Sequence, residues 1–374
     1  MREKLPILNR PLRVMHIISG DLWAGAESQA FTLLKHLHAN TILHVILMND
    51  GELCRRLQGL NIPVTLILES ELSSVKILTH LITIIRTFKP DILHTHRQKE
   101  NILGNLANVI ASFPLKKRTP SVRTAHGAPE FQPTGKQKVQ VWMDNFVGKY
   151  LQQAIISVST DLSQKLELIF PSHKIRVIQN GVDSTSLKSE VTTTEFRSAA
   201  PDHVHIGIIG RIEPVKRVDL FIDMAAILVK SHGMTQLLHF HIIGEGSLRS
   251  EMEKKVGGLN LNDRIHFLGH REDVASCIDS LDVIVMCSDH EGTPMTALEA
   301  MALGTPLVAH KVGGLVEILQ DYPKLLVANH SSAGYAAALQ NLLSEKKLNV
   351  ALNPIYEATT NAGRTLDLYK TLAA

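Results

Sequence analysis

Short apolar, β-branched runs constrain this chain more than any other feature, because they recur along all 374 residues and alternate with segments of helical period. The run LDVIVMCS (281–288), for example, is short, apolar and β-branched, which is typical of a buried parallel strand. Such alternation predicts an α/β fold with mostly parallel sheets that helices cover on both faces. The runs form a first series at 13–18, 42–48, 64–68, 91–96, 121–126, 154–159 and 175–179, and a second at 204–210, 238–244, 264–269, 281–287, 306–310 and 324–328.

The two series predict two domains, which the chain length also favours, because one hydrophobic core rarely serves so many residues. Residues 184–203 are rich in Ser, Thr and charge and lack periodicity, so we expect a linker there. The expected α/β domains are therefore 1–183 and 204–350. Residues 351–374 are typical of a helical segment that follows the last strand and can cross back to the N-terminal domain. A ligand shared by both domains is expected in a cleft between them.

Composition and charge exclude several classes of protein. The chain is 44% hydrophobic and 20% charged, as in an ordinary globular protein, and its net charge of +3 is too small to predict nucleic-acid binding. Cys54, Cys277 and Cys287 form no CxxC pair, so buried free thiols in a reducing cytosol are expected. The first residues lack a signal-peptide core, and no uncharged run approaches the ~18 residues of a membrane-spanning helix. We expect a cytoplasmic protein, with peripheral contact at the inner face of a membrane left open.

The stretch SDHEGTPMTALEAMALGTP (288–306) places two glutamates eight positions apart, directly after a predicted strand. Thr293 can cap a helix with its hydroxyl, and Pro294 suits the first helical position, where a missing N–H costs nothing. Glu291 is therefore expected in the loop at the carboxyl end of a strand, which is where ligands bind in open α/β sheets. Glu299 is expected more than one turn inside the helix, where it can meet another part of the same ligand.

The stretch GRIEPVKR (210–217) also follows a predicted strand and opens a helical pattern. It brings a guanidinium, Arg211, and an ammonium, Lys216, near a helix start, which suits a diphosphate leaving group. Taken alone, this spacing is more typical of solvated residues at a helix start.

Other nucleotide and catalytic motifs are missing or altered. The glycines of ISGDLWAGAESQAF (18–31) have the wrong spacing for GxGxxG, and IIGEGSLRS (242–250) carries Arg249 where the third glycine would stand. These departures argue against a dinucleotide oxidoreductase. The chain also has no GxSxG, Walker A, HExxH or DxD sequence, which argues against hydrolase, P-loop and metal-dependent classes.

Three histidines end predicted strands in the first series. His94 and His96 share one face of their strand, and His126 ends another strand in RTAHGAPEF. No carboxylate or cysteine stands at a spacing that favours a metal site, so we interpret these side chains as hydrogen-bonding groups. His126 is the preferred ligand contact, because it precedes a glycine in a loop that is expected to open towards the second domain.

Five motifs, taken together and in this order, resemble those of glycosyltransferase family 4, the retaining nucleotide-sugar transferases of the two-Rossmann GT-B fold. The resemblance covers almost the whole chain. One departure is Ala24, which stands where the family more often has the first glycine of Gly-Gly-Ala-Glu. The motifs are AGAE (24–27), TAHG (124–127), VSTDL with NGVD (158–162 and 180–183), GRxxxxK (210–216), and EGTPMTALEAMALGTPLVA (291–309), which matches the family's E-x7-E motif.

The resemblance implies roles for individual residues. Arg211 and Lys216 would bind the donor diphosphate, Glu299 the ribose hydroxyls, and Glu291 the hydroxyls of the transferred sugar. Gly25 would offer its N–H to phosphate. The loop at the start of the helix of the E-x7-E motif would add N–H donors towards the sugar and phosphate; it consists of Gly292, Thr293, Pro294, Met295 and Thr296. His126 would lie by the sugar at the reacting face. The N-terminal domain would then bind the acceptor and the C-terminal domain the nucleotide-sugar.

The implied activity is transfer of a hexose or N-acetylhexosamine from a nucleotide-sugar, most simply a UDP-sugar, with retention and without a metal or other cofactor. The acceptor would be a glycan or lipid-linked molecule in surface polysaccharide or glycolipid biosynthesis. A sugar-nucleotide epimerase of the same two-domain fold is the alternative, and it would convert the donor without an acceptor. A non-catalytic nucleotide-sugar binding protein is a third class, which is expected to lack the phosphate-binding cations.

A basic, aromatic segment of the first domain allows two interpretations. GKQKVQVWMDNFVGKYLQQ (135–153) mixes three lysines with Trp142, Phe146 and Tyr150, and KKR (116–118) precedes it. Such a patch can rest on anionic lipid and meet a lipid-linked acceptor. A helix that packs by its aromatic face is slightly favoured over this interpretation.

Overall fold

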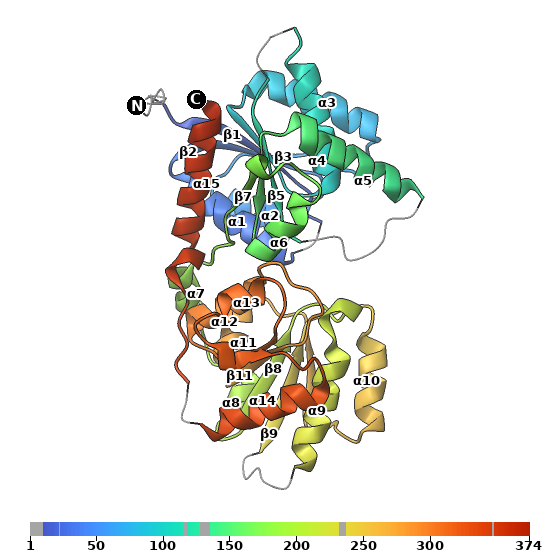
Figure 1. The fold of residues 1–374 in the computed structure, drawn as a ribbon, viewed down its shortest axis with the longest axis vertical. Helices are drawn as coiled ribbons and strands as arrows, with labels where there is room; N and C mark the ends of the chain where they lie inside the picture. The colour runs from blue at the N-terminus through green and yellow to red at the C-terminus, as the bar shows by residue number, and fades with distance from the viewer. Residues whose placement is uncertain (1–9, 22, 115–117, 128–134, 232–236, 346–347) are drawn as a thin grey trace. The chain divides into compact units, whose positions relative to one another are not determined.

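The computed structural model describes residues 10–21, 23–114, 118–127, 135–231, 237–345 and 348–374. The chain divides into two compact units (Figure 1). The first contains Met1–Gly181 together with Ile355–Ala374, and the second contains Val182–Pro354. The C-terminal helix therefore belongs to the unit that begins the chain.

The first unit is built on a seven-stranded sheet of order β3-β2-β1-β4-β5-β6-β7, in which every pairing is parallel. Each strand overlaps a run that the sequence predicts, with β1 and β2 beginning one residue before theirs, so the prediction of a parallel α/β sheet is confirmed. The strands are β1 (Leu12–Ile18), β2 (Thr41–Leu47), β3 (Val64–Leu66), β4 (Ile92–Thr95), β5 (Ser121–Ala125), β6 (Ala154–Ser157) and β7 (Ile175–Val177).

The second unit repeats this architecture with a six-stranded parallel sheet of order β10-β9-β8-β11-β12-β13. Its strands are β8 (Val204–Ile209), β9 (Leu238–Ile243), β10 (Ile265–Gly269), β11 (Val283–Met286), β12 (Leu307–His310) and β13 (Leu326–Val327).

Helices cover both sheets. In the first unit, α1 contacts α2 and α15, and α4 contacts α3 and α5; in the second, α9 contacts α10 and α14, and α12 contacts α7, α11 and α13. The first unit contains α1 (Gly25–His38), α2 (Glu52–Gly59), α3 (Ser74–Phe88), α4 (Gln98–Ala111), α5 (Lys136–Phe146), α6 (Thr160–Glu167) and α15 (Ala358–Ala373). The second contains α7 (Ser184–Ser189), α8 (Glu195–Ala199), α9 (Val218–Lys230), α10 (Arg249–Gly258), α11 (Val274–Asp279), α12 (Met295–Leu303), α13 (Gly314–Ile318) and α14 (Ser332–Ser344).

The core of the first unit lies on both faces of its sheet, because successive side chains of a strand point to opposite faces. Val14 and Ile18 of β1 pack with α1, α2 and α15, whereas Met15 and Ile17 pack with α3 and α4. Tyr369 of α15 belongs to the first of these clusters and is fully buried. Figure 1 shows α15 (red) alongside α1 within this unit. The last helix thus completes one helical layer of a sheet whose strands come from the first half of the chain.

Two details differ from the sequence prediction. The segment 184–203, predicted as a linker, contains α7 and α8, and the Asp183 side chain caps α7 by accepting a hydrogen bond from the Ser186 N–H. Helix α12 begins at Met295 rather than Pro294, and no side chain caps it. Pro294 occupies the N-cap position in an extended conformation, so Thr293, the predicted cap, lies one residue before the observed cap position.

The aromatic face of α5 is exposed, contrary to the slightly favoured interpretation that it packs inside the domain. Trp142 and Tyr150 keep 67% and 66% of their surface exposed, and Phe146 keeps 46%. The three rings form a stack along the helix, with centroids 6.1 Å and 5.0 Å apart. Lys116 and Lys117 lie outside the described residues. No helix among those described is both long enough and apolar enough to cross a bilayer.

The second sheet carries a ladder of five histidines on β8, β9 and β10 and just before β8. His205 is paired in register with His239, and His241 with His266. Their ring nitrogens lie in hydrogen-bond contact, with Nδ1 to Nε2 distances of 2.9 Å for His205 to His241 and 3.0 Å for His239 to His266; His203 also reaches His239 at 2.9 Å. Burial lowers the pKa of His239 to about 4 and that of His241 to about 2, and neighbouring histidines add to this. His239 and His241 are therefore neutral at physiological pH.

The histidine ladder predicts that the second unit loses stability in acid. Because the folded pKa of His241 lies below the unfolded value, the unfolded chain binds the extra proton between pH 6.5 and about pH 2, and stability falls as pH decreases through this window. We expect His241→Gln to reduce the slope of unfolding free energy against pH by up to about 1.4 kcal/mol per pH unit, which corresponds to one proton. Amide hydrogen exchange of peptides from β8 to β10, corrected for intrinsic rates, measures the local unfolding free energy at pH 7 and pH 5. His38→Gln, an exposed position of the first unit, is the control, and an unchanged slope in His241→Gln contradicts the prediction.

Candidate functional site

The strand order of each sheet defines where a ligand can enter. In the first sheet the order reverses between β1 and β4, and in the second between β8 and β11. At such a reversal the helices that follow the two strands lie on opposite faces, which opens a crevice at the carboxyl ends of the strands. The loops after β8 and β11 carry the GRxxxxK and E-x7-E motifs, and the loops after β1 and β5 carry AGAE and TAHG.

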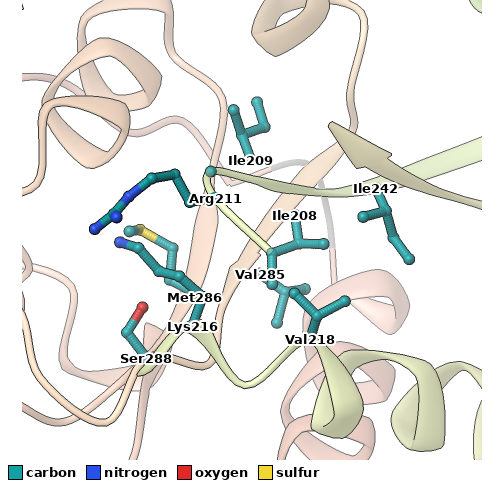
Figure 2. A pocket seen from close by; sticks show the side chains of 10 residues that line it. Ile208, Ile209, Arg211, Lys216, Val218, Ile242, Val285, Met286 and Ser288 are labelled. Carbon is teal, nitrogen blue, oxygen red and sulfur yellow. The ribbon is translucent and has the colours of Figure 1, made fainter. Parts of the chain in front are cut away.

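A pocket lies at the reversal point of the second sheet (Figure 2). Its floor is apolar and includes Ile208, Val285 and Val218, which come from β8, β11 and the start of α9. Arg211 and Lys216 line it as well, and Figure 2 shows their charged ends side by side on one side of this floor. The pocket therefore joins an apolar base with two cations.

Arg211 and Lys216 are held by the loop that follows β8. Gly210, at φ +146°, turns the chain out of the strand, in a conformation that side-chain-bearing residues rarely adopt. The short 3-10 helix η3 (Pro214–Lys216) then ends on Lys216. Arg211 is exposed, and among the described residues its guanidinium has no hydrogen-bond partner. It is consequently available to an anionic ligand.

Lys216 pairs with Glu291 across the reversal point. Its Nζ donates to Glu291 Oε1 at 2.6 Å, and the Glu291 side chain is only 9% exposed. The Asp289 N–H donates to the Val215 carbonyl at 2.9 Å, which ties the same two loops together through their backbones. The cation of one motif and the acid of the other are thus direct neighbours.

The loop from Glu291 to Pro294 is fixed by two glycines that follow β12. A Cβ on Gly313 would lie 1.9 Å from the Glu291 carbonyl oxygen, and one on Gly314 would lie 1.9 Å from that of Gly292. Only glycine allows so close an approach. This contact holds Gly292 and the buried Thr293 at the start of α12, where the first N–H groups of the helix, including those of Met295 and Thr296, have no partner within the helix. The start of α12 therefore offers donors to an anion or a hydroxyl-rich ligand.

Glu299 lies on α12, one turn further along, and is partly buried. Burial, together with the nearby carboxylate of Glu190, raises its pKa to about 7. Glu190 follows α7, which packs against α12. No cation among the described residues pairs with Glu299, so a ligand that donates hydroxyl hydrogen bonds would relieve its desolvation.

Sequence reasoning missed a second charged group beside this pocket. Arg217 pairs with Asp219 at 2.9 Å and with Asp289 at 3.4 Å, and His330 Nε2 lies 2.9 Å from the same Asp289. These bonds raise the pKa of Arg217 further and hold its charge within the protein. Arg217 is next to Lys216 in the sequence, so the sequence does not distinguish the two cations. In the structure Lys216 lines the pocket, whereas Arg217 is paired with Asp219 and Asp289.

In the first unit, Gly25 and His126 lie at the carboxyl edge of the sheet. Gly25 is the first residue of α1, and its N-cap, Ala24, makes no side-chain cap. Arg97, which follows β4, pairs with Glu27 of α1 and, at 2.9 Å, with Asp21. These ion pairs fix the loop of the AGAE motif against the end of β4.

His126 is the outermost ring of a buried histidine cluster. His96 Nδ1 lies 3.2 Å from His126 Nε2, and His16 Nδ1 lies 3.1 Å from His96 Nε2. His94 contacts the hydroxyl of Tyr369 through Nδ1 and lies 2.8 Å from Thr124 Oγ1 through Nε2. The sequence indicates only that His94 and His96 share a face of their strand. The contributions of His16 and Tyr369 come from distant segments and have no sequence signal.

Three of these imidazoles, on His16, His94 and His96, lie close enough together to be considered as ligands of one metal ion. The rings of His94 and His96 are stacked at 4.6 Å and only 12° from parallel, so their in-plane lone pairs do not converge on one point. Both nitrogens of His94 also contact hydroxyl groups. The arrangement is therefore that of a hydrogen-bonded array and fits a metal poorly.

The predicted site residues thus fall into two groups. Arg211, Lys216, Glu291 and the segment 292–296 come together in the second unit, with Glu299 on the same helix. Gly25 and His126 belong to the first unit. The second-unit group combines cations, helix N–H donors and carboxylates. These groups can bind the phosphates and hydroxyls of a phosphorylated, hydroxyl-rich molecule.

Family models match both units. The model "Glycosyltransferase Family 4" matches residues 23–186, and the model "Glycosyl transferases group 1" matches residues 192–358. Together they cover every motif described above.

Individual relatives are more distant. The chain is 26% identical over 291 residues to the Escherichia coli UDP-Gal:alpha-D-GlcNAc-diphosphoundecaprenol alpha-1,3-galactosyltransferase, covering 75% of this chain and 73% of that protein. It is 28% identical to the D-inositol 3-phosphate glycosyltransferase of Geodermatophilus obscurus, covering 69% of this chain and 60% of that protein.

Among solved structures, Anabaena HepE in complex with UDP and glucose is similar, with a TM-score of 0.82, 19% identity, and coverage of 96% of this chain and all of that one. This likeness establishes the fold as GT-B. From the matched models and this fold, the chain belongs to glycosyltransferase family 4 and is a nucleotide-sugar-dependent glycosyltransferase with two Rossmann-like units.

Proposed function

We propose that this enzyme transfers a hexose or N-acetylhexosamine from a UDP-sugar to a glycan or lipid-linked acceptor, with retention of configuration and without a metal ion. The observation that carries the proposal is that Arg211 and Lys216 line one pocket and that Lys216 contacts Glu291 in the loop that leads into α12, whose first N–H groups have no partner within the helix. A diphosphate leaving group gains negative charge as the glycosidic bond breaks, so donors and cations at this point stabilise the transition state.

Arg211 and Lys216 take different parts in this scheme. The guanidinium of Arg211 is exposed and unpaired among the described residues, so it can bind two phosphate oxygens in a fork. Lys216 is a point charge that already shares a hydrogen bond with Glu291. A diphosphate bound here would share Lys216 with Glu291, and the two cations would supply the charge that a divalent ion supplies in metal-dependent transferases.

The two glutamates are proposed to bind hydroxyl groups. Glu291 lies in the loop beside Lys216, where its second carboxylate oxygen can accept from hydroxyls of the transferred sugar. Glu299 is partly buried with a pKa of about 7, and two ribose hydroxyls would supply hydrogen bonds that its carboxylate does not receive from the described residues. In this scheme neither glutamate is a nucleophile, and the departing phosphate takes the acceptor proton.

Gly25 and His126 are proposed to act from the first unit. The N–H of Gly25, at the start of α1, would donate to phosphate, and His126 would bind the transferred sugar at the reacting face. Because burial lowers the pKa of His126 to about 4, the ring is neutral at pH 7 and suits hydrogen bonding rather than charge neutralisation.

The choice of substrates follows the relatives. The Escherichia coli relative is named for UDP-Gal and an undecaprenol-linked acceptor, and the Anabaena structure contains UDP and glucose. A UDP-sugar donor and a glycan or lipid-linked acceptor in surface polysaccharide or glycolipid synthesis are therefore proposed here. The epimerase alternative needs no acceptor; it is disfavoured because both named curated relatives are transferases.

A lipid-linked acceptor would be met most simply by an enzyme that touches the membrane. The exposed aromatic surface consists of Trp142 and Phe146 of α5 and of Tyr150, which follows this helix. The exposed Lys138 and Lys149 lie next to these rings in the sequence. Aromatic rings that insert at the lipid headgroups and lysines that pair with anionic lipid are the usual elements of peripheral binding. We propose that this surface rests on the inner face of a cytoplasmic membrane.

Loss of either pocket cation is expected to slow transfer strongly. Arg211→Ala and Lys216→Ala should each lower kcat by roughly two to three powers of ten, because each removes one transition-state donor. Initial rates of UDP release with a saturating donor measure the effect. Lys254→Ala, an exposed cation of α10, is the control. A folded Arg211→Ala protein with near-wild-type kcat contradicts the assigned role.

The proposed reaction should require an acceptor and tolerate chelation. Incubation with a panel of UDP-sugars is expected to give a glycosylated product only when a cell lipid or glycan extract is added, at the same rate in EDTA as in Mg²⁺, because Arg211 and Lys216 provide the positive charge. Mass spectrometry of product and donor follows the reaction. Conversion of the donor alone supports the epimerase, and activity that disappears in EDTA and returns with Mn²⁺ or Mg²⁺ refutes the metal-free mechanism.

Membrane contact should depend on the α5 surface. We expect the protein to sediment with vesicles that contain anionic lipid at low salt. Trp142→Ala should weaken this binding roughly tenfold, because it removes one aromatic side chain that would be buried in the lipid. Val75→Ser, an exposed apolar position on α3, is the matched control. Equal sedimentation of Trp142→Ala and wild type, or no binding at low salt, removes the proposal.

A further inference from the structure

A continuous hydrogen-bonded array connects the C-terminal helix to His126. It runs from Tyr369 Oη to His16 Nε2 at 3.4 Å, from His16 Nδ1 to His96 Nε2 at 3.1 Å, and from His96 Nδ1 to His126 Nε2 at 3.2 Å. A side branch joins the Tyr369 hydroxyl to His94. His16, His94 and Tyr369 have no exposed surface, and His96 is only 5% exposed, so water has little access to the array.

The array exists because α15 returns to the first sheet. His16, His94 and His96 occupy the face of β1 and β4 that α1 and α15 cover, at positions where alternate neighbours are apolar core residues. Tyr369 reaches this face from α15, 353 residues after His16 in the sequence. A hydroxyl from the last helix therefore ends a row of rings whose other end is His126.

Burial keeps every ring neutral. It lowers the pKa of His16 to about 3 and that of His126 to about 4, and it lowers those of His94 and His96 well below their usual value. The neighbouring cation is Arg97, which disfavours a charge on His96 and His126 and is itself paired with Glu27 and Asp21. Among the described residues, Arg97 is the charged neighbour that acts on the pKa of His126.

A neutral imidazole has one N–H and one lone pair, so the bonds of the array must all run in the same direction. In one direction each histidine carries its proton on Nε2, which is the intrinsically preferred tautomer of neutral imidazole. His126 then donates to His96, His96 to His16, and His16 to the Tyr369 oxygen, while the Tyr369 hydroxyl donates to His94 and His94 donates to Thr124. This direction leaves Nδ1 of His126 as a bare acceptor.

Nδ1 of His126 is the one atom of the array that lacks a hydrogen-bond partner among the described residues, and it is shielded from solvent. A buried polar atom without a partner requires an explanation, such as a ligand group that is missing from the structure. An acceptor lone pair at this place suits a hydroxyl of the sugar that His126 is proposed to bind.

We propose that His96 is a positioning residue for glycosyl transfer, which together with His16 and Tyr369 fixes His126 as the Nε2–H tautomer and directs its Nδ1 lone pair to a substrate hydroxyl. The proposal rests on the proposed function through the role of His126. His96 acts through His126 and does not touch the substrate.

The test uses the full-length protein labelled with ¹⁵N-histidine, in which imidazole nitrogen shifts report the tautomer directly. The His126 signals are assigned by comparison with His126→Gln. We expect the Nε2–H form in the wild type, and a mixture of tautomers in His96→Phe and in Tyr369→Phe, which lacks only the hydroxyl at the far end. Both variants should lower kcat about tenfold, the value of one lost hydrogen bond, with little change in the KM for the donor. His44→Gln, a half-buried histidine of β2 that contacts Thr65, is the control and should change neither reading.

Each outcome decides the proposal. An Nδ1–H tautomer in the wild type, unchanged His126 shifts in Tyr369→Phe, or altered shifts without a loss of kcat would overturn it. Tyr369→Phe is conservative enough to be informative if His96→Phe does not fold. The tautomer is read without substrate, so an absence of glycosyl transfer in the wild type would count against the proposed function and leave the shifts to test the array.

Discussion

The reversal of strand order in each parallel sheet is the constraint on which the rest of the structure depends. Because helices leave β8 and β11 on opposite faces, the loops after these strands separate at the carboxyl edge and leave room for a ligand. The GRxxxxK and E-x7-E motifs occupy those two loops, although 75 residues separate Lys216 from Glu291. The same reversal between β1 and β4 creates the edge that carries Gly25 and, one strand further, His126.

The ion pair of Lys216 with Glu291 keeps the second-unit pocket ready for a charged ligand. A buried carboxylate without a partner is costly, so the lysine stabilises Glu291 while no ligand is bound. A diphosphate can share the ammonium, and a sugar hydroxyl can then supply a hydrogen bond to the carboxylate. Arg211 differs, because among described residues its side chain is unpaired, and binding it to phosphate breaks no internal bond. The pocket thus combines one cation that is paired with Glu291 and one that has no partner among the described residues.

Sequence patterns were sufficient for the strands, because runs buried on both faces leave a local signal that needs no knowledge of the rest of the chain. They were insufficient where the decisive partner is remote. The cap of α12 depends on the close approach of Gly313 and Gly314 to the loop at Glu291, so the local Thr-Pro signal misplaced it. The segment 184–203 has weak periodicity because α7 and α8 are only six and five residues long. Likewise, nothing near His94 indicates that Tyr369 will lie against it.

The enzyme separates fixed charge from neutral hydrogen bonding. The groups proposed to stabilise a phosphate, Arg211 and Lys216, are a guanidinium and an ammonium. The histidines are held in the opposite state, because both the array at His126 and the ladder at His241 are buried and lie beside other imidazoles. A positive imidazole at the reacting face would compete with the cations for the phosphate. In the proposed reaction, a neutral His126 would orient a sugar hydroxyl and leave the phosphate to Arg211, Lys216 and the N–H donors.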